Sequence, residues 1–380
     1  MRAAALAILL HAALAAPLPL ALTRGYTFLA AQYNASAGCW GGKPDCKSYL
    51  WTSANEVESV ANYYFLTRDA SALALLNASA TALRPLACDC WHDDNLWLIL
   101  AWTRASAVTG DASHLAAARA LFANLVGPWA AWNSTCGGLN WEKGVPYRNS
   151  ITNELFLTAA MRLHAATAGG GVAPPVAGLT YLQWAQREWA WLNSTALYRP
   201  DVGVFADGLS EATCDLSAWG GAFWSYNSGA LLDGLALLGN ATGEPALAQF
   251  AVHVARAAAA YFSVGGDGVL REVSCGRPAG RCDGKDGQQF KGAFVRHLGY
   301  LAAALPPAAA GDAAWARAYL ATQSASIAAN NARDGAPGQT QFGLLWQGPF
   351  DEDAAEPWVA HGAALDALLA GALLDAQSEA

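Results

Sequence analysis

Positive charge is scarce in this chain. Only 22 of its 380 residues are lysine or arginine, and the formal net charge is -8. A protein that binds a nucleic acid backbone or an anionic membrane surface needs clustered cations to neutralise phosphate groups, and no basic run occurs here. The sequence therefore argues against nucleic acid, anionic membranes and acidic polymers as partners.

Metal-ligand spacings are missing as well. Zinc sites are built from closely spaced cysteine and histidine pairs. The eight cysteines show no CxxC spacing, and the seven histidines show no HxxxH spacing near them. Disulfide bonds are therefore the preferred interpretation of the cysteines, with a metal site as the alternative. We expect no metal ion and no organic cofactor.

An even number of cysteines is typical of an exported protein with disulfide bonds. They are Cys39, Cys46, Cys88, Cys90, Cys136, Cys214, Cys275 and Cys282. The first two and the last two form local pairs that we expect to bridge. The third and fourth are too close in sequence to bridge each other comfortably, so we expect them to reach separately to the fifth and sixth. Spacing alone does not fix this connectivity.

The N-terminal segment is typical of a secretory signal. Arg2 precedes the apolar stretch 3–16, and small residues follow that suit a signal peptidase. We interpret residues 1–23 as a signal peptide and residues 24–380 as one domain. We expect no later segment to be apolar for long enough to span a bilayer, and the C-terminal residues are polar. The expectation is a secreted, monomeric protein without a membrane span.

Five Asn-x-Ser/Thr sequons occur along the chain, at Asn34, Asn77, Asn133, Asn193 and Asn240. Such sequons accept N-linked glycans in secreted proteins. Chance occurrence in a chain rich in serine and alanine is the alternative for each single site. Together with a signal peptide, the five sequons favour a glycoprotein of a eukaryotic secretory route.

Helical periodicity runs through almost the whole chain. Apolar residues recur at helical spacing, and breakers such as Gly127-Pro128 and Gly239-Asn240 stand where helices must end. The expected helix pairs are 47–66 with 69–84, 93–107 with 111–126, 150–167 with 178–193, 225–238 with 244–262, and 289–304 with 311–330, followed by a helix at 356–375. Tyr26–Tyr33 can supply a twelfth helix that pairs with the last one. Six hairpins then close a ring, so we predict an all-α fold, an (α/α)6 barrel.

Polar and aromatic clusters recur at the predicted helix starts. They are Trp51, Asp93-Asp94, Tyr147-Arg148-Asn149 with Asn153, Tyr226-Asn227, Phe290-Lys291 with Arg296, and Trp346. Each cluster precedes or opens one hairpin, so in a toroid all of them crowd around one mouth. Chemically different groups that converge on one cavity are typical of an active site. The alternative is that they are ordinary helix caps.

The pair Asp93-Asp94 is the most informative feature of the chain. It lies in the segment Trp91-His92-Asp93-Asp94-Asn95-Leu96-Trp97, in a chain with 16 tryptophans. Carboxylates at a helix start often only cap free backbone N–H groups, and capping is the alternative here. Carboxylates beside indole faces favour sugar chemistry, so we predict Asp93 and Asp94 as catalytic residues. The neighbouring candidates for substrate binding are Trp91, Asn95 and Trp97.

The remaining candidates for substrate binding are Tyr147, Asn149, Asn153, Tyr226, Asn227, Lys291, Arg296 and Trp346. Asn149 and Asn153 are four residues apart, so they share a helical face and can present two amides to sugar hydroxyls, with local capping as the alternative. Lys291 and Arg296 lie in an otherwise apolar helix start, so each needs a carboxylate or a ligand oxygen as partner. Structural ion pairing is the preferred interpretation for Arg296.

Four motifs occur in a fixed order along the chain. They are Asp93-Asp94 between tryptophans, Tyr147-Arg148-Asn149-Ser150-Ile151-Thr152-Asn153-Glu154-Leu155-Phe156, Tyr226-Asn227 followed by Gly229, and Phe290-Lys291-Gly292 to Arg296. Together they resemble the ordered motifs of glycoside hydrolase family 76, which includes bacterial endo-α-1,6-mannanases and fungal cell-wall mannosidase-like proteins. The resemblance spans nearly all of the mature chain and implies a six-hairpin α/α barrel. Arg148 stands where the family pattern leads us to expect lysine, and Ser228 where it often has glutamine.

The resemblance implies a retaining glycoside hydrolase that cleaves α-1,6-mannosidic linkages in α-mannan or another mannose-containing glycan. It assigns Asp93 as the nucleophile and Asp94 as the general acid/base. Retaining enzymes hold their two carboxyl groups about 5 to 5.5 Å apart. Neighbouring residues at a helix start, about 100° apart around the axis, can provide this separation. Two like charges so close to each other should raise one of the two pKa values.

Two other functions are alternatives. A transglycosidase would move mannosyl or GPI-type anchor glycans onto another polymer during cell-wall assembly. A carbohydrate-binding protein would have lost catalysis, and the intact aspartate pair argues against that. Analysis of products with and without an acceptor sugar distinguishes a hydrolase from a transferase.

Overall fold

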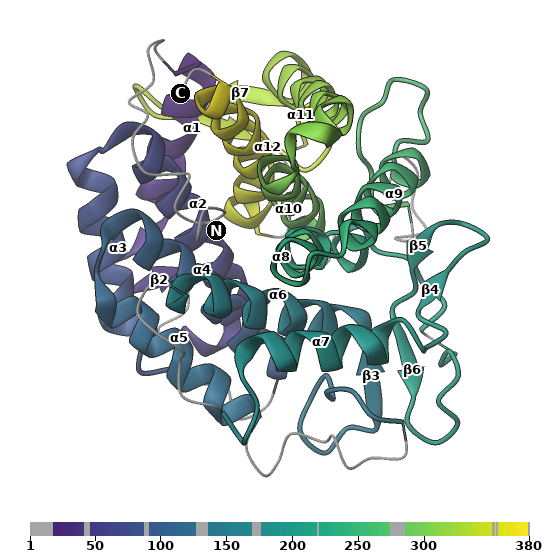
Figure 1. The fold of residues 1–380 in the computed structure, drawn as a ribbon. Coiled ribbons are helices and arrows are strands. Elements are labelled where there is room, and N and C mark those ends of the chain that lie inside the picture. Colours follow the sequence, from purple (N-terminus) through teal and green to yellow (C-terminus); the bar gives the residue numbers. More distant parts are fainter. Residues whose placement is uncertain are drawn as a thin grey trace.

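The computed structural model describes residues 18–41, 46–86, 91–126, 136–168, 176–218, 220–273, 286–351, 354 and 356–378. In these ranges the chain forms twelve α-helices, joined by turns and by strands of two or three residues. The predicted all-α fold is confirmed, and the helices are arranged as an (α/α)6 barrel (Figure 1).

Six helices form the inner ring of the barrel. They are α2 (Leu50–Thr67), α4 (His92–Thr109), α6 (Ser150–Thr167), α8 (Leu232–Thr242), α10 (Phe290–Ala304) and α12 (Pro357–Ser378). Each helix contacts the next one, and α12 contacts α2, so the ring is closed. Inner helices are covered on both sides, which explains why every residue of α6 from Ser150 to Leu163 is buried.

The other six helices cover this ring from outside. They are α1 (Leu20–Ala31), α3 (Ala70–Leu83), α5 (Ala112–Leu125), α7 (Tyr181–Leu192), α9 (Pro245–Phe262) and α11 (Ala310–Asn330). Each packs on the inner helix that precedes it in the chain, except α1, which packs on α12 (Figure 1). The expected twelfth helix is confirmed, although it begins at Leu20, inside the segment interpreted as a signal peptide. Leu22 is completely buried in the core.

Helix α8 differs from the helix expected at 225–238. Ser225–Ser228 form a 3-10 turn, and α8 then continues through Gly239 and Asn240 to Thr242. The predicted break at Gly239-Asn240 is wrong because Gly243 ends the helix instead. Its φ of 76° is the left-handed conformation that glycine adopts without a steric penalty. The other helices lie close to their expected positions.

Four antiparallel pairs of short strands lie at the ends of the helices. They are β1 (Tyr33–Asn34) with β2 (Cys39–Trp40), β3 (Tyr147–Asn149) with β6 (Gly208–Ser210), β4 (Tyr198–Arg199) with β5 (Val204–Phe205), and β7 (Ala332–Asp334) with β8 (Thr340–Phe342). The pair β3–β6 joins the segment that opens α6 to a segment far along the chain, with Tyr147 opposite Ser210. These pairs were not predicted from the sequence.

Two disulfide bonds lie within the described residues. Cys39 bonds to Cys46, as expected. Cys136 bonds to Cys214, so the expectation that these two cysteines reach separately to the third and fourth cysteines is wrong. The loop before β3 and the turn after β6 come together through strand pairing, which sequence spacing does not reveal. The cysteines outside the described residues are Cys88, Cys90, Cys275 and Cys282.

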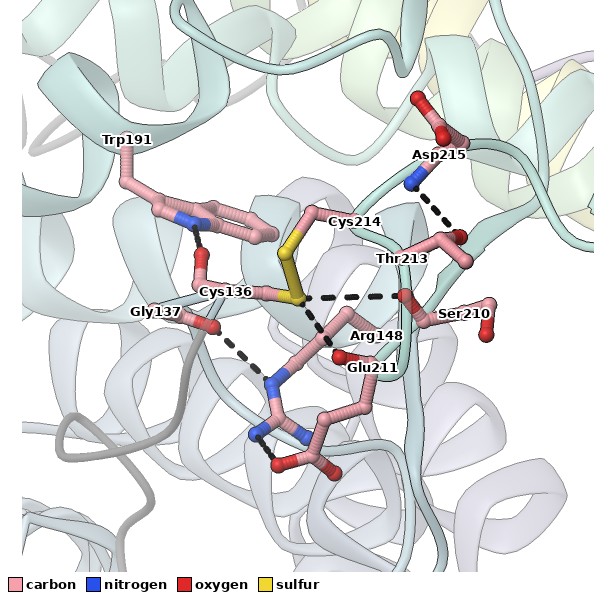
Figure 2. The surroundings of a disulfide bond; sticks show 9 residues. All are labelled: Cys136, Gly137, Arg148, Trp191, Ser210, Glu211, Thr213, Cys214 and Asp215. Atoms are coloured by element: carbon pink, nitrogen blue, oxygen red, sulfur yellow. Dashed lines mark hydrogen bonds and ion pairs between the residues drawn. A yellow bond between two sulfur atoms is a disulfide. The ribbon is translucent and has the colours of Figure 1, made fainter.

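The Cys136–Cys214 bond is surrounded by polar contacts that join the same two segments (Figure 2). Arg148 of β3 donates from Nε to the backbone oxygen of Gly137 at 2.9 Å and from Nη2 to Glu211 Oε1 at 3.1 Å. Arg148 is completely buried, so a charged side chain that departs from the family pattern has a structural partner here. The loop after Cys136 is thus fixed covalently and electrostatically.

Helix α12 corrects one expectation about membranes. By length and composition alone, Pro357–Gln377 is apolar enough to cross a bilayer, so the expectation that the chain holds no such segment is wrong. The same stretch is 83% buried inside the barrel, as an inner helix must be. Its apolar character is explained by its place in the core.

The described sequons lie at or near the surface. Asn77, Asn193 and Asn240 are exposed, and Asn34 is half-buried. Asn133 lies outside the described residues. Glycosylation of the exposed sites stays a prediction.

Replacement of Cys136 and Cys214 together by serine should lower the free energy of unfolding by about 2–4 kcal/mol, because the bond closes a long loop in the unfolded chain. Urea unfolding of the oxidised proteins measures this loss. The matched control replaces Cys39 and Cys46, which are only 7 residues apart and so close a much shorter loop. An equal or larger loss in the control would contradict the prediction.

Candidate active site

Residues at the starts of the inner helices meet at one end of the barrel, which we call the mouth. Trp51 is near the start of α2, Asp93 lies in the first turn of α4, and Phe290 opens α10. The Phe290 ring stacks on Tyr226 with 3.9 Å between ring centroids, and its centroid lies 6.2 Å from that of Trp51. Side chains from several predicted clusters therefore lie side by side.

Both carboxyl oxygens of Asp93 accept a hydrogen bond. The backbone N–H of Asp94 donates to Oδ1 at 3.0 Å, and Trp141 Nε1 donates to Oδ2 at 3.0 Å. Backbone and indole N–H groups can only donate, so both contacts favour the ionised carboxylate. The side chain of Asp94, next along the same turn, is 7% exposed.

The pKa of Asp93 is nevertheless raised to about 7. Burial of the carboxyl group is the main cause, and the negative charge of Asp286 adds to it, while the two hydrogen bonds oppose the shift. Asp286 in turn accepts a hydrogen bond from Trp51 Nε1 at 3.0 Å. A carboxyl group whose pKa lies near neutral pH, next to a second carboxyl group, is typical of a catalytic acid–base pair.

Trp141 was not predicted as a site residue. The segment before it is held against the start of α4, since the His92 N–H donates to the Trp141 carbonyl at 2.9 Å and His92 Nδ1 lies 2.7 Å from the Asn140 carbonyl. The loop therefore reaches across from the Cys136 disulfide to the aspartate pair. In the sequence Trp141 is one more tryptophan in a tryptophan-rich chain, and no local pattern distinguishes it.

Asn149 and Asn153 have local partners in the structure. Asn149 caps α6 by accepting from the Thr152 N–H at 3.3 Å. Asn153 accepts from the Leu139 N–H at 2.7 Å and donates to the Leu139 carbonyl at 3.0 Å. The structure thus favours the capping alternative for Asn149 and gives Asn153 the task of holding the loop that carries Trp141.

Tyr147 and Asn227 share one carboxylate. The Tyr147 hydroxyl donates to Asp207 Oδ2 at 2.5 Å, and Asn227 Nδ2 donates to Asp207 Oδ1 at 3.0 Å. Burial raises the pKa of Asp207, although both hydrogen bonds lower it. The pKa of Tyr226 is also raised, first by burial and then by nearby charges that include Asp207 and Asp93. Asp207 lies in a short irregular segment and was not predicted.

The tryptophans of the Asp-Asp motif lie in different surroundings. Trp91 is 36% exposed and immediately precedes α4, so its indole is available at the surface. Trp97 is 2% exposed, with its ring centroid 6.0 Å from that of Trp51. Asn95 is buried and donates to the Trp91 carbonyl at 3.3 Å. Of these candidates, Trp91 is the most exposed.

Lys291 and Trp346 form a buried pair near the mouth. Lys291 Nζ donates to the Leu344 carbonyl at 2.7 Å and lies 4.7 Å from the Trp346 ring centroid. Burial lowers the pKa of Lys291 to about 7, while the negative charge of Glu272 opposes the shift. Burial raises the pKa of Glu272 to about 7. The structure gives this predicted cation partners within the protein.

Arg296 lies inside the barrel, on the same helix as Lys291. Its Nη1 donates to Asp366 Oδ2 at 3.0 Å, its Nη2 donates to Asn55 Oδ1, and its Nε lies 3.5 Å from Glu58 Oε2. The side chain is 1% exposed. These contacts agree with structural ion pairing, the preferred interpretation from the sequence. Ser228, the other departure from the family pattern, accepts from the Phe205 N–H at 3.1 Å and so supports β5.

Comparison with known proteins decides the family. Residues 24–378 match the family model for glycosyl hydrolase family 76. The chain belongs to this family.

Within the described ranges, no group of three His, Cys, Asp or Glu side chains is arranged to hold a metal ion.

Curated relatives of this family member include fungal proteins. The chain is 30% identical over 240 residues to mannan endo-1,6-alpha-mannosidase DCW1 of Candida albicans, an alignment that covers 61% of this chain and 49% of that protein. With DCW1 of Saccharomyces cerevisiae it is 26% identical over 328 residues, covering 82% of this chain and 65% of that protein. The chain therefore spans about half to two thirds of the length of these relatives.

Solved structures of the family share the fold. The α-1,6-mannanase GH76A of Salegentibacter sp. HEL1_6, solved as an inactive variant with two consecutive aspartates replaced and in complex with alpha-1,6-mannotetrose, has a TM-score of 0.74 at 20% identity, covering 93% of this chain and 99% of that one. Dfg5 from Chaetomium thermophilum, in complex with glucosamine, has a TM-score of 0.74 at 19% identity, covering 93% and 89%. At this identity the likeness is one of fold.

Replacement of Asp93 by asparagine should stabilise the fold increasingly as the pH rises. The folded protein raises the pKa of Asp93 to about 7, above its value of about 3.9 in an unfolded chain. The stability that the protonated carboxyl contributes is complete below the unfolded pKa and is lost as the pH rises through about 7. Asparagine does not titrate and avoids this loss.

Urea unfolding of both proteins between pH 4 and pH 8 measures the difference. We expect the stability of the Asp93→Asn variant relative to the wild type to grow across this range and to level off above about pH 7. A difference that is constant with pH would contradict a raised pKa for Asp93.

Proposed function

We propose that this protein is a secreted glycoside hydrolase that cleaves α-1,6-mannosidic linkages with retention of configuration. Asp93 is the nucleophile and Asp94 the general acid/base. The observation that carries the proposal is the setting of Asp93, whose two oxygens accept bonds from N–H donors at the mouth of the barrel. Those donors orient the carboxylate and favour its ionised form against the burial that raises its pKa, while Asp94, its neighbour along the helix, transfers the proton.

The reaction runs in two steps. In the first, protonated Asp94 gives its proton to the glycosidic oxygen as Asp93 attacks the anomeric carbon, so that the leaving sugar departs and a glycosyl-enzyme ester forms. In the second, Asp94 takes a proton from water, which attacks the same carbon and releases Asp93. Because the pKa of Asp93 is raised to about 7, this carboxyl group becomes fully ionised, as the attack requires, only as the pH rises above that value.

Substrate binding is proposed for the aromatic and polar groups around the pair. Trp91 is exposed beside the start of α4, and the stacked rings of Tyr226 and Phe290 lie at the same mouth. Tyr147 offers a hydroxyl group that Asp207 keeps in place, and the completely buried Asn227 supports Asp207 from behind. Trp97, Lys291 and Trp346 are proposed to support this surface from behind, because all three are buried.

The names of the relatives support the substrate. The curated relatives are named as mannan endo-1,6-alpha-mannosidases, and a solved family structure holds alpha-1,6-mannotetrose. That structure is an inactive variant with two consecutive aspartates replaced, which agrees with a catalytic Asp-Asp pair. Secretion is supported by the signal-like N-terminus and by the disulfide bonds.

The single variants Asp93→Asn and Asp94→Asn should each turn over linear α-1,6-mannan more slowly, by a factor of about 10³ or more, while the protein stays folded. The matched control is Asp312→Asn, which changes a carboxylate in the first turn of the outer helix α11. Product release, with the first-formed anomer read by NMR, measures activity and stereochemistry together. Wild-type turnover in either active-site variant, or an inverted product, would overturn the proposal. Longer products with an added acceptor sugar would instead identify a transglycosidase.

Replacement of Trp141 by phenylalanine should move the acidic limb of the pH–rate profile to higher pH. The indole N–H stabilises ionised Asp93, so its loss raises the pKa of Asp93 and delays formation of the nucleophile. The control is Trp315→Phe, which changes a tryptophan on the outer helix α11 and not at the start of an inner helix. A profile with lower activity but an unchanged acidic limb would contradict this role of Trp141.

A further inference from the structure

A third carboxylate lies at the mouth beside the Asp93–Asp94 pair. Asp286 opens the 3-10 turn η6 (Asp286–Gln288), directly before α10, and it is exposed. Burial is the main cause of the raised pKa values of Asp93 and Tyr226, and the negative charge of Asp286 adds to both. Because the effect of a charge weakens with distance, Asp286 lies close to the proposed reaction centre.

The carboxylate of Asp286 has neither of the usual structural roles at a helix start. No backbone N–H of η6 or α10 donates to it, and within the described ranges no lysine or arginine forms an ion pair with it. Its hydrogen-bond donor in the described part of the chain is Trp51 Nε1, which lies 3.0 Å from Oδ1. Oδ2 therefore remains able to accept a hydrogen bond from a ligand.

The position of Asp286 is fixed from two sides. Its carbonyl accepts from the Gln289 N–H at 3.0 Å, and the Gln288 and Gln289 side chains are completely buried. Gln289 Nε2 donates to Glu56 Oε1 at 2.9 Å. Because Glu56 and Trp51 both belong to α2, this inner helix holds the turn through its side chain contacts. An acceptor held in this way is oriented before a substrate arrives.

We propose that Asp286, oriented by Trp51, accepts a hydrogen bond from a ring hydroxyl of the mannosyl unit bound at the aspartate pair. This role rests on the function proposed above and gives that function a specificity-determining residue. A hydroxyl that donates to an ionised carboxylate forms a bond about twice as strong as one between neutral groups. A sugar that lacks this hydroxyl leaves the carboxylate without its partner, so the site discriminates against it.

Calorimetric titration with α-1,6-mannotetraose tests this role in an Asp93→Asn background, in which the glycan binds but is not cleaved. Addition of Asp286→Asn should weaken binding by a factor of about 10. Asparagine keeps one oxygen that accepts from Trp51 and replaces the second accepting oxygen by an NH₂ donor. The matched control, Asp312→Asn in the same background, removes an exposed carboxylate on the outer helix α11 and should leave the affinity unchanged.

Two failures are distinguishable in this titration. Equal affinities of Asp93→Asn with and without Asp286→Asn would overturn the role of Asp286 and leave the proposed function intact. Absence of binding to a folded Asp93→Asn variant would show that the proposed substrate is wrong, and the role of Asp286 would fall with it. Circular dichroism verifies that each variant is folded.

The pH–rate profile of Asp286→Asn, with Asp93 intact, tests the proximity of the two carboxylates. Removal of the negative charge of Asp286 lowers the pKa of Asp93, so the acidic limb should move to lower pH. This direction is opposite to the one expected for Trp141→Phe. An acidic limb at the wild-type position would place Asp286 too far from Asp93 for one mannosyl unit to contact both, and would overturn the proposal.

Discussion

Closure of the inner ring is the constraint on which the rest of the structure depends. Because α12 lies against both α10 and α2, six helices can surround a common axis and present their starts at one mouth. The positive ends of helix dipoles favour carboxylates there, and Asp93 and Asp94 occupy such a position in α4. The loops before the helices then complete the site, with the Cys136–Cys214 bond and Asn153 holding the one that reaches Asp93.

A ring of helices covered on both sides has no solvent face on which to place charge, so the polar residues of the interior must satisfy one another. Arg296 and Arg162 do so with Glu58, Asp366 and Asp233. The loss of hydration offsets much of the attraction in such pairs. We therefore attribute to them the mutual alignment of the helices more than net stability. Arg104 differs from these two arginines, because its Nε donates to the Asn62 amide oxygen and no carboxylate in the described part of the chain lies within ion-pair distance of it.

The sequence predicted the helices well because their apolar periodicity and their breakers are local signals. The predicted end of α8 was wrong, because Gly239 lies within the helix and Gly243 ends it. The sequence does not show which of the two glycines adopts the left-handed backbone conformation. The aspartate pair and the family motifs were visible as contiguous residues. Trp141, Asp207 and Asp286 were missed because they lie in irregular or 3-10 segments outside the α-helices, and only the fold brings them to the mouth. The pairing of Cys136 with Cys214 was missed for the same reason.

The place of α12 has a consequence for biosynthesis. This helix belongs to the inner ring, and it is the last of the six inner helices to leave the ribosome. Until then the nascent chain holds five inner helices of an open ring. The sides of α2 and α10 that later contact α12 are uncovered. Exposed surfaces of this kind are prone to aggregation. The barrel therefore stays open until α12 has been synthesised, and this open ring exposes more apolar surface than a protein that buries its core domain by domain.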